Sequence, residues 1–299
     1  MKNIQLIVLL FAIQGAQLVA QETKINVYEY PMEESALLWE VKGPKNESNS
    51  YLFGTKHMIQ EEFYIYPDWM DTLVTRADVL VMELAGLPNP LKALKYIMLP
   101  EGSVWDYFNE IQEDSLIVWA KQTAGMKEKA FRSTFSKMKP FAIVQLSALK
   151  MMGDNIKSYE QEFQTLAESN KIELYGLETI ADQMKLFDDM TMEEQAEMVM
   201  ETIRENEEDA AKMLNQLQRT FHSQEIDSLH MLVQDEGGMI AAKENVFLND
   251  RNYKWIPKIK EIIDQKTAFI AVGAGHLGGP EGVIRLLQKE GYTLTPVKL

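Results

Sequence analysis

The chain has 299 residues, a formal net charge of -15 and a hydrophobic content of 46%, with five tryptophans. This composition indicates a globular protein with a substantial core, long enough for one large domain or two modest ones. Lysine and arginine are scattered along the acidic chain, which argues against a nucleic-acid-binding protein. The chain has no cysteine, which excludes disulfides, thiolate metal ligands, a cysteine nucleophile and lipoprotein acylation.

Residues 1–20 have the pattern of a secretory signal peptide. Lys2 gives a positive start, Ile4–Ile13 is mostly apolar, and small residues follow up to Ala20. The apolar run is too short to span a membrane comfortably, and no other segment is long and apolar enough. We therefore predict cleavage after Ala20, export to the periplasm or the extracellular space, and no stable membrane insertion of the mature chain. A retained N-terminal anchor is the alternative.

The first part of the mature chain is rich in predicted strands. Ala36–Val41 and Ser50–Phe53 predict a β-hairpin, because two apolar runs flank a polar turn that contains glycine. Tyr66–Ala77 predicts a helix with one apolar side. Asp78–Glu83 is apolar except at its ends and predicts a buried strand with Glu83 at its carboxyl end.

From residue 90 to about residue 245 the periodicity is helical, apart from one predicted strand at Ile172–Tyr175. The candidate helices lie near residues 107–122, 126–137, 141–151, 159–169, 179–188, 191–205, 207–219 and 224–234.

The last part of the chain again alternates between predicted helices and strands. Leu248–Ile263 predicts a long helix, Ala268–Val272 a buried strand, Glu281–Gln288 a helix and Tyr292–Val297 a closing strand. Strand-rich ends therefore flank a helical middle. We predict an α/β fold, one domain over residues 21–299, in which segments from both ends form one mixed sheet. The helical insertion, at about residues 90–245, would then form a cap.

The pattern Gly-x-x-His occurs twice, each time directly after an apolar run. Gly54–His57 follows the strand predicted at Ser50–Phe53, and Gly273–His276 follows the strand predicted at Ala268–Val272. With 16 glycines and 4 histidines in the chain, chance predicts roughly 0.2 such tetrads. Open α/β sheets bind ligands at the carboxyl ends of strands. Imidazole serves there as a neutral metal ligand or a general base; the alternative is that both are ordinary loop histidines.

Three charged residues are further candidates. Glu83 ends an apolar strand, where an unpaired buried charge is costly, so we expect it to have a partner, a metal or solvent. Arg251, early in the last long predicted helix, suits an electrostatic clamp on a carbonyl oxygen or carboxylate; pairing on its own helix is the alternative. Glu178 follows a predicted strand and is either a carboxylate that orients a histidine or a helix N-terminal acid. His222 and His230 lack the turn context and are expected to be structural or surface residues.

Several short segments, in one order along nearly the whole mature chain, match a known family. They are Leu37–Val41, Tyr51–His57, Val81–Leu84, Ser158–Glu160, Tyr175–Thr179 with Gln183, Arg251–Asn252 with Trp255, and Val272–Gly282. On these segments the chain resembles the TraB/GumN family, which includes the animal Tiki proteases and bacterial pheromone-shutdown proteins. Lys56 departs from the pattern, since an apolar residue is more usual at its position.

The resemblance implies an α/β fold and a hydrolase-like site built from His57, Glu83, Arg251 and His276. Tiki members look like metal-dependent peptidases. We therefore expect first a metallopeptidase-like enzyme in which His57, Glu83 and His276 hold a divalent ion, Mn, Co or Zn, with an open position for water and Arg251 stabilising the oxyanion. The substrate would be a peptide or a small amide or ester.

The remote relatives of the family, the erythromycin esterases and a haem-binding lipoprotein, leave two alternatives open. One is a metal-free hydrolase of esters or lactones, with one histidine as general base and Glu83 assisting. The other is a module that binds a peptide, haem or metal without turnover. The sequence specifies no oligomeric state.

Overall fold

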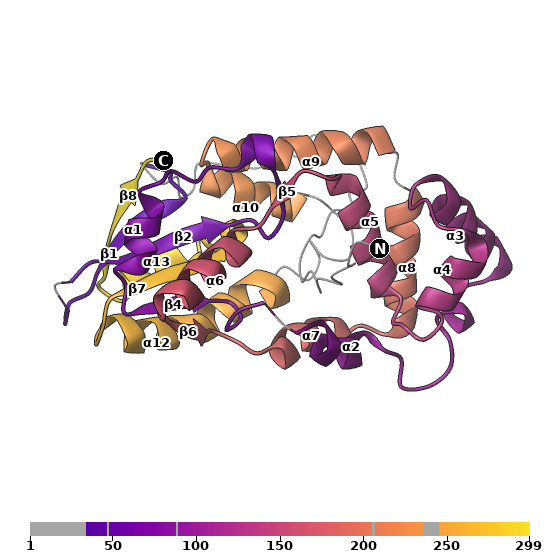
Figure 1. Ribbon diagram of the computed structural model, residues 1–299, viewed down its shortest axis with the longest axis horizontal. Coiled ribbons are helices and arrows are strands. Elements are labelled where there is room, and N and C mark those ends of the chain that lie inside the picture. The colour runs from indigo at the N-terminus through magenta and orange to yellow at the C-terminus, as the bar shows by residue number, and fades with distance from the viewer. Residues whose placement is uncertain (1–33, 47, 88, 205–206, 236–244) are drawn as a thin grey trace. The chain divides into compact units, whose positions relative to one another are not determined.

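A computed structural model describes residues 34–299 except 47, 88, 205–206 and 236–244 (Figure 1). The described residues form two compact units. Residues 34–87, 155–179 and 215–299 make an α/β unit, and residues 89–154 and 180–214 make a helical unit. Part of the middle of the chain, including the strand predicted at Ile172–Tyr175, thus belongs to the α/β unit. The predicted signal peptide lies outside the described residues, so export stays a prediction.

The α/β unit is built on a six-stranded mixed sheet in the order β6-β4-β7-β2-β1-β8. The four strands β6, β4, β7 and β2 are parallel, whereas β1 pairs antiparallel with both β2 and β8. This confirms the predicted α/β class and the predicted hairpin. The strand bounds are β1 Leu38–Lys42, β2 Ser50–Thr55, β4 Val79–Met82, β6 Glu173–Gly176, β7 Ala268–Gly273 and β8 Thr293–Val297.

The register of the parallel strands places their carboxyl ends at one edge of the sheet. Thr55 of β2 pairs with Gly273 of β7, and Met82 of β4 pairs with Ala271 of β7 and with Gly176 of β6. The loops that follow these strands therefore start side by side. This edge is where a parallel sheet positions functional side chains.

Helices cover the sheet of the α/β unit, and short elements connect them (Figure 1). An aromatic cluster fills the space between β2, α6 and β7, where the ring centroids of Phe53 and Phe163 are 5.6 Å apart and those of Phe163 and Phe269 are 5.0 Å apart. The bounds are α1 Met70–Thr75, α6 Tyr159–Asn170, α10 Ile226–Asp235, α12 Asp250–Ile263 and α13 Val283–Lys289, with the 3-10 turns η1 Glu61–Phe63 and η4 Ala274–His276, a π-helical turn η3 Asn245–Asn249, and a two-stranded sheet of β3 Ile59–Gln60 and β5 Ile156–Lys157.

The helical unit has its own core. Phe131 contacts Trp105, Trp119 and Phe135, with ring centroids 5.8, 6.2 and 4.9 Å apart. Among the described residues, no helix is long and apolar enough to cross a membrane. The bounds are α2 Pro90–Ile97, η2 Val104–Tyr107, α3 Glu110–Gln122, α4 Glu128–Phe135, α5 Phe141–Met152, α7 Ile180–Asp188 and α8 Met192–Arg204; α9, Glu207–His222, begins in this unit and ends in the α/β unit.

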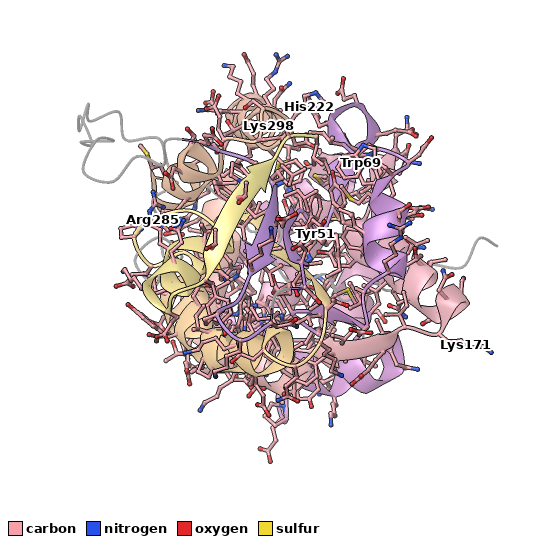
Figure 2. The ribbon with its side chains drawn as sticks, turned by 90° about the vertical axis from the view of Figure 1, so that its left-hand side faces the viewer. Tyr51, Trp69, Lys171, His222, Arg285 and Lys298 are labelled. Carbon is pink, nitrogen blue, oxygen red and sulfur yellow. The ribbon has the colours of Figure 1, made fainter. Side chains whose placement is uncertain are left out.

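Helix α10 holds the glycine-rich loop that follows η4. The Asp227 carboxylate accepts a hydrogen bond from the Gly279 N–H at 2.9 Å and two from the guanidinium of Arg285, each at 2.9 Å; Arg285 is labelled in Figure 2. One turn later, the imidazole of His230 lies directly against Gly279, which has a φ of 77°. Glycine is needed at 279 both for this left-handed conformation and for the close approach of His230.

Replacing Gly279 by alanine should destabilise the fold by about 3 kcal/mol, because left-handed strain adds to a steric clash. The new Cβ would lie 2.2 Å from the Nε2 atom of His230. The matched control is Gly291→Ala, where φ is 88° but a Cβ meets no atom within 4 Å; its cost should be about 1 kcal/mol. Urea unfolding measures both. Equal losses for the two variants would show that the contact with His230 is unimportant.

Candidate functional site

The five predicted site residues lie at one edge of the sheet. His57 follows β2, Glu83 follows β4, Glu178 follows β6, and His276 ends the η4 turn after β7. Arg251 comes from the first turn of α12 and connects three of the others by hydrogen bonds. All four parallel strands therefore contribute to one site, as expected for carboxyl ends that meet at the same sheet edge.

Arg251 connects Glu83, Glu178 and His276, and its side chain is buried. Its Nε donates to Glu178 at 3.1 Å, and its Nη2 donates to Glu83 and Glu178, each at 2.5 Å. Its Nη1 contacts the carbonyl oxygen of Phe247 at 3.1 Å and Nε2 of His276 at 3.0 Å. These contacts use the five N–H groups that a guanidinium has. Arg251 therefore has no N–H group left to stabilise an oxyanion, which was its predicted role. Its contacts make it a positioning residue.

His276 is buried, and its hydrogen bonds define its tautomer. Asn252 donates through Nδ2 to the carbonyl oxygens of His276 and Glu281, at 3.4 and 2.9 Å, so its Oδ1 accepts. That oxygen lies 2.7 Å from Nδ1 of His276, which assigns the proton to Nδ1 and leaves Nε2 to accept from Arg251. Burial and the adjacent Arg251 charge lower the pKa of His276 to about 3. The imidazole is thus neutral at physiological pH.

Glu83 is buried and charged. Its Oε1 accepts a hydrogen bond from the Gly273 N–H at 2.9 Å, while its Oε2 receives Arg251. Burial by itself would raise the pKa of this carboxyl, but the charges of Arg251 and His57 and the hydrogen bond from Gly273 outweigh it and hold the pKa well below its usual range. Glu178 also pairs with Arg251 and accepts a hydrogen bond from the indole N–H of Trp255 at 3.3 Å. It orients the arginine rather than a histidine.

His57 forms a separate pair with Glu160, at the amino end of α6. Nδ1 of His57 lies 2.8 Å from Oε1 of Glu160. The same carboxylate accepts hydrogen bonds from the hydroxyls of Thr55 at 2.6 Å and Ser158 at 3.2 Å. The His57 side chain is 22% exposed, whereas those of Glu83 and Arg251 are 6% and 4% exposed. Nε2 of His57 has no hydrogen-bond partner among the described residues.

The carboxylates around His57 favour its charged form. Burial alone would lower the pKa of His57, but the charge and hydrogen bond of Glu160, together with the charge of Glu83, raise it to about 9; the charge of Arg251 opposes them. Its partner responds in the opposite direction, since His57 and the Thr55 hydroxyl overcome the effect of burial and lower the pKa of Glu160. Without a substrate, the pair is an imidazolium and a carboxylate at neutral pH.

Glu160 was not among the predicted site residues, yet it directly contacts His57. The available signal was the Ser158–Glu160 segment, in which a serine N-cap precedes an acidic first turn. Acidic residues are common in that place for the helix dipole alone, so this signal does not identify a site. His222 and His230 contact the backbone carbonyl oxygens of Phe63 and Gly275, at 3.2 and 3.4 Å, which suits structural roles.

The predicted metal ligands do not fit a divalent ion in this arrangement. The lone pair of His276 and the Oε2 atom of Glu83 both face the guanidinium of Arg251, whose fixed charge would repel a dication. Within the described part of the chain, no three histidine or acidic side chains are placed so that they could hold a metal ion. A metal at His57, Glu83 and His276 therefore stays a sequence prediction, without support from this geometry.

Comparison with known proteins identifies the family. A family model described as the TraB/PrgY/gumN family matches residues 37–296, and the chain belongs to that family. The matched range includes every site residue described above. No curated protein and no solved structure matches the chain.

Replacing Arg251 by glutamine should destabilise the protein by about 3–5 kcal/mol at pH 7, because two buried carboxylates lose their partner. The lowered pKa of Glu83 gives stability that is present above the unfolded-state pKa and is lost as pH falls through the folded-state value. In the variant, Glu83 loses the charge of Arg251 and its burial then raises the pKa of its carboxyl, so the variant gains stability between pH 7 and pH 5. The difference in free energy of unfolding between the wild type and the variant, measured by denaturant titration, should therefore decrease from pH 7 to pH 5.

Arg132→Gln is the matched control for this experiment. Arg132 also contacts two carboxylates, Glu113 at 2.6 Å and Glu128 at 3.2 Å, but it is 35% exposed. Its loss should cost about 1 kcal/mol or less. A deficit for Arg251→Gln that is as small as this, or that does not change with pH, would show that the buried network is not a principal source of stability.

Proposed function

We propose that the protein is a hydrolase in which His57 activates a water molecule, and that its substrate class is carboxylic esters or lactones. The observation that carries the proposal is the His57–Glu160 pair: a carboxylate binds Nδ1 at 2.8 Å, and the side chain is partly exposed. Nε2 is left without a partner among the described residues. A histidine oriented in this way by a carboxylate is the arrangement that general-base catalysis uses. The signal-peptide pattern of residues 1–20 extends the proposal to an exported enzyme.

In the proposed reaction one group, the His57 imidazole, transfers a proton both when water attacks and when the leaving group departs. Nε2 of neutral His57 accepts a proton from water while the water oxygen attacks the acyl carbon. The imidazolium formed is stabilised by Glu160. It then gives the proton to the leaving alkoxide as the tetrahedral intermediate collapses, which yields an acid and an alcohol. An alkoxide leaves more readily than an amine, and Arg251 has no spare N–H for the oxyanion, so the arrangement favours esters over amides.

The buried network supports this chemistry indirectly. Arg251 fixes the carboxylate of Glu83, whose negative charge acts on His57 and helps to raise its pKa. His276 accepts a hydrogen bond from the same arginine and remains neutral, so it adds no positive charge beside His57. The network thus sets the electrostatic field in which His57 works. The metallopeptidase alternative would require the guanidinium to move away from the predicted ligands.

The pH dependence of hydrolysis should identify His57 as the base. With a pKa of about 9, the neutral form increases as pH rises, so kcat/KM should climb about tenfold per pH unit from pH 7 and level off near pH 9. Glu160→Gln removes the main cause of the raised pKa. Its profile should level off below pH 7, with a lower plateau because the ring loses its orientation. Turnover of p-nitrophenyl esters and of fluorogenic peptides measures the profiles.

Two further measurements complete this test. His57→Ala should reduce turnover by about a hundredfold or more, while circular dichroism shows that the fold is retained. Proton NMR titration of the His57 ring, assigned with the same variant, should give a pKa near 9 that falls in Glu160→Gln; an unchanged pKa would show that Glu160 does not act on His57. Wild-type turnover by His57→Ala would disprove the proposed base, and tight ligand retention without a product would favour a binding module.

Exhaustive chelation should leave the activity unchanged, because no step of the proposed reaction uses a metal ion. The measurement is kcat/KM before and after treatment with EDTA and dialysis, beside the metal content of the protein by mass spectrometry. Loss of activity that Mn, Co or Zn restores, together with bound metal that disappears in His57→Ala and in His276→Ala, would instead establish the metallopeptidase-like alternative.

A further inference from the structure

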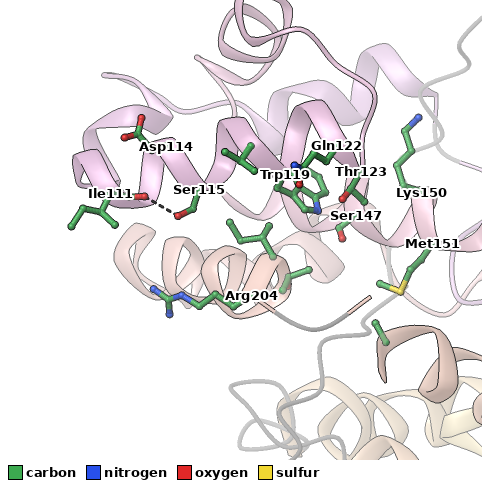
Figure 3. A pocket seen from close by; sticks show the side chains of 14 residues that line it. Ile111, Asp114, Ser115, Trp119, Gln122, Thr123, Ser147, Lys150, Met151 and Arg204 are labelled. Atoms are coloured by element: carbon green, nitrogen blue, oxygen red, sulfur yellow. Dashed lines mark hydrogen bonds between the residues drawn. The ribbon is translucent and has the colours of Figure 1, made fainter. Parts of the chain in front are cut away.

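A cavity of about 840 Å³ lies within the helical unit. Side chains of α3, α5 and α8 line it, and Ala210 of α9 contributes to the lining (Figure 3). Its volume falls in the range of pockets that bind small molecules, about 300–1,000 Å³. No residue of the proposed catalytic machinery contributes to it, so a ligand here would serve a second function.

The walls of the cavity expose apolar side chains at an unusual level. Ile111 is 80% exposed and Val118 is 51% exposed. They lie seven residues apart on α3 and therefore on the same face of the helix. Ile203 of α8 and Met151 of α5 add further apolar surface. Such a concentration of exposed apolar side chains is a marker of a binding site rather than of ordinary solvent-facing surface.

Two polar groups of residues that line the cavity have no hydrogen-bond partner among the described residues. Trp119 is 8% exposed and Ser147 is 5% exposed, and both line the cavity. Among the described residues, neither the indole N–H nor the hydroxyl has a hydrogen-bond partner. Both atoms are accessible to solvent, because the fully buried and unpaired side-chain atoms of the described residues belong to Gln145, Gln183 and Gln195. An indole N–H can only donate, which calls for a ligand that carries an acceptor.

The charges of the cavity are distributed unevenly along its length. Lys150 lies three residues after Ser147 on α5 and so shares its face of the helix. It forms no ion pair with any described residue. In the view of Figure 3, Ser147, Lys150 and Met151 lie at one end of the cavity, and Ile111 and Asp114 lie at the other. Arg204 also lines the cavity, but it pairs with Glu197 at 3.1 Å. A negatively charged group is therefore favoured at the Lys150 end.

From these observations we infer that the cavity binds a medium-chain carboxylic acid. The carboxylate accepts hydrogen bonds from Trp119 and Ser147 and lies near the ammonium of Lys150. The alkyl chain runs along α3, across Val118 and Ile203 towards Ile111. The eight helical steps from Ile111 to Trp119 rise about 12 Å along the helix, which is enough for an extended chain of medium length.

The test uses decanoate as the probe and the full protein, with isothermal titration calorimetry. Decanoate should bind, and decanol, which lacks the carboxylate, should bind roughly tenfold more weakly. Ser147→Ala should weaken decanoate binding roughly tenfold, and Lys150→Gln roughly two- to fivefold, since its ammonium is exposed. Val118→Trp fills the cavity from a position that is half exposed, and it should abolish binding while leaving the circular dichroism spectrum unchanged.

Lys129→Gln provides the matched control, because it removes the same charge from an exposed site on α4 that does not line the cavity. Its affinity for decanoate should equal that of the wild type. The inference is overturned if decanoate does not bind, if decanol binds as tightly as decanoate, or if Val118→Trp binds decanoate like the wild type. Because the readout is binding, its result does not depend on whether the protein is a hydrolase.

Discussion

The guanidinium of Arg251 is the contact on which the candidate site depends. A buried carboxylate is costly unless it is paired and hydrogen-bonded, and this site buries two of them, Glu83 and Glu178. One arginine satisfies both and also binds His276. With every N–H of the arginine used, the network is closed, and its three partners are fixed relative to one another. Such a network supplies rigidity and a constant electrostatic field. Catalysis needs in addition a group with an atom that is available to bind water or substrate.

His57 is that group, and it differs from His276 although both follow the same sequence pattern. Both belong to Gly-x-x-His segments after parallel strands, yet the pKa of His57 is raised to about 9 and that of His276 is lowered to about 3. Burial acts to lower both pKa values, and the nearest charge then separates them: a carboxylate raises the pKa of His57, and a guanidinium lowers that of His276 further. Two titratable groups whose environments move their pKa values in opposite directions are typical of sites with divided roles. Similar motifs therefore support different tasks.

Most strands and helices followed from hydrophobic periodicity, which is a local property of the sequence, although helix α2 at Pro90–Ile97 was not predicted. The common sheet edge followed from the general rule that carboxyl ends of parallel strands meet. The predicted hairpin Ala36–Val41 with Ser50–Phe53 and the strand at Ala268–Val272 were confirmed within a few residues. Residues His57, Glu83, Glu178 and His276 were found by their position after strands. Their partners were not predictable, because which acid pairs with which base depends on contacts distant in sequence. Arg251 and Glu178, separated by 73 positions, are an example.

The order of the strands in the sheet has a consequence for synthesis of the chain. Strand β7 comes from residues 268–273 but lies between β4 and β2, which come from the first third of the sequence. Until β7 emerges, β2 and β4 have no common neighbour, and neither Gly273 nor His276 exists to complete the site. The nascent chain must therefore keep two apolar strand edges unpaired during most of translation. Such late, non-local pairing makes folding slow and exposes the chain to aggregation, so this sheet should depend on chaperones that shield strand edges more than a sheet assembled in sequence order.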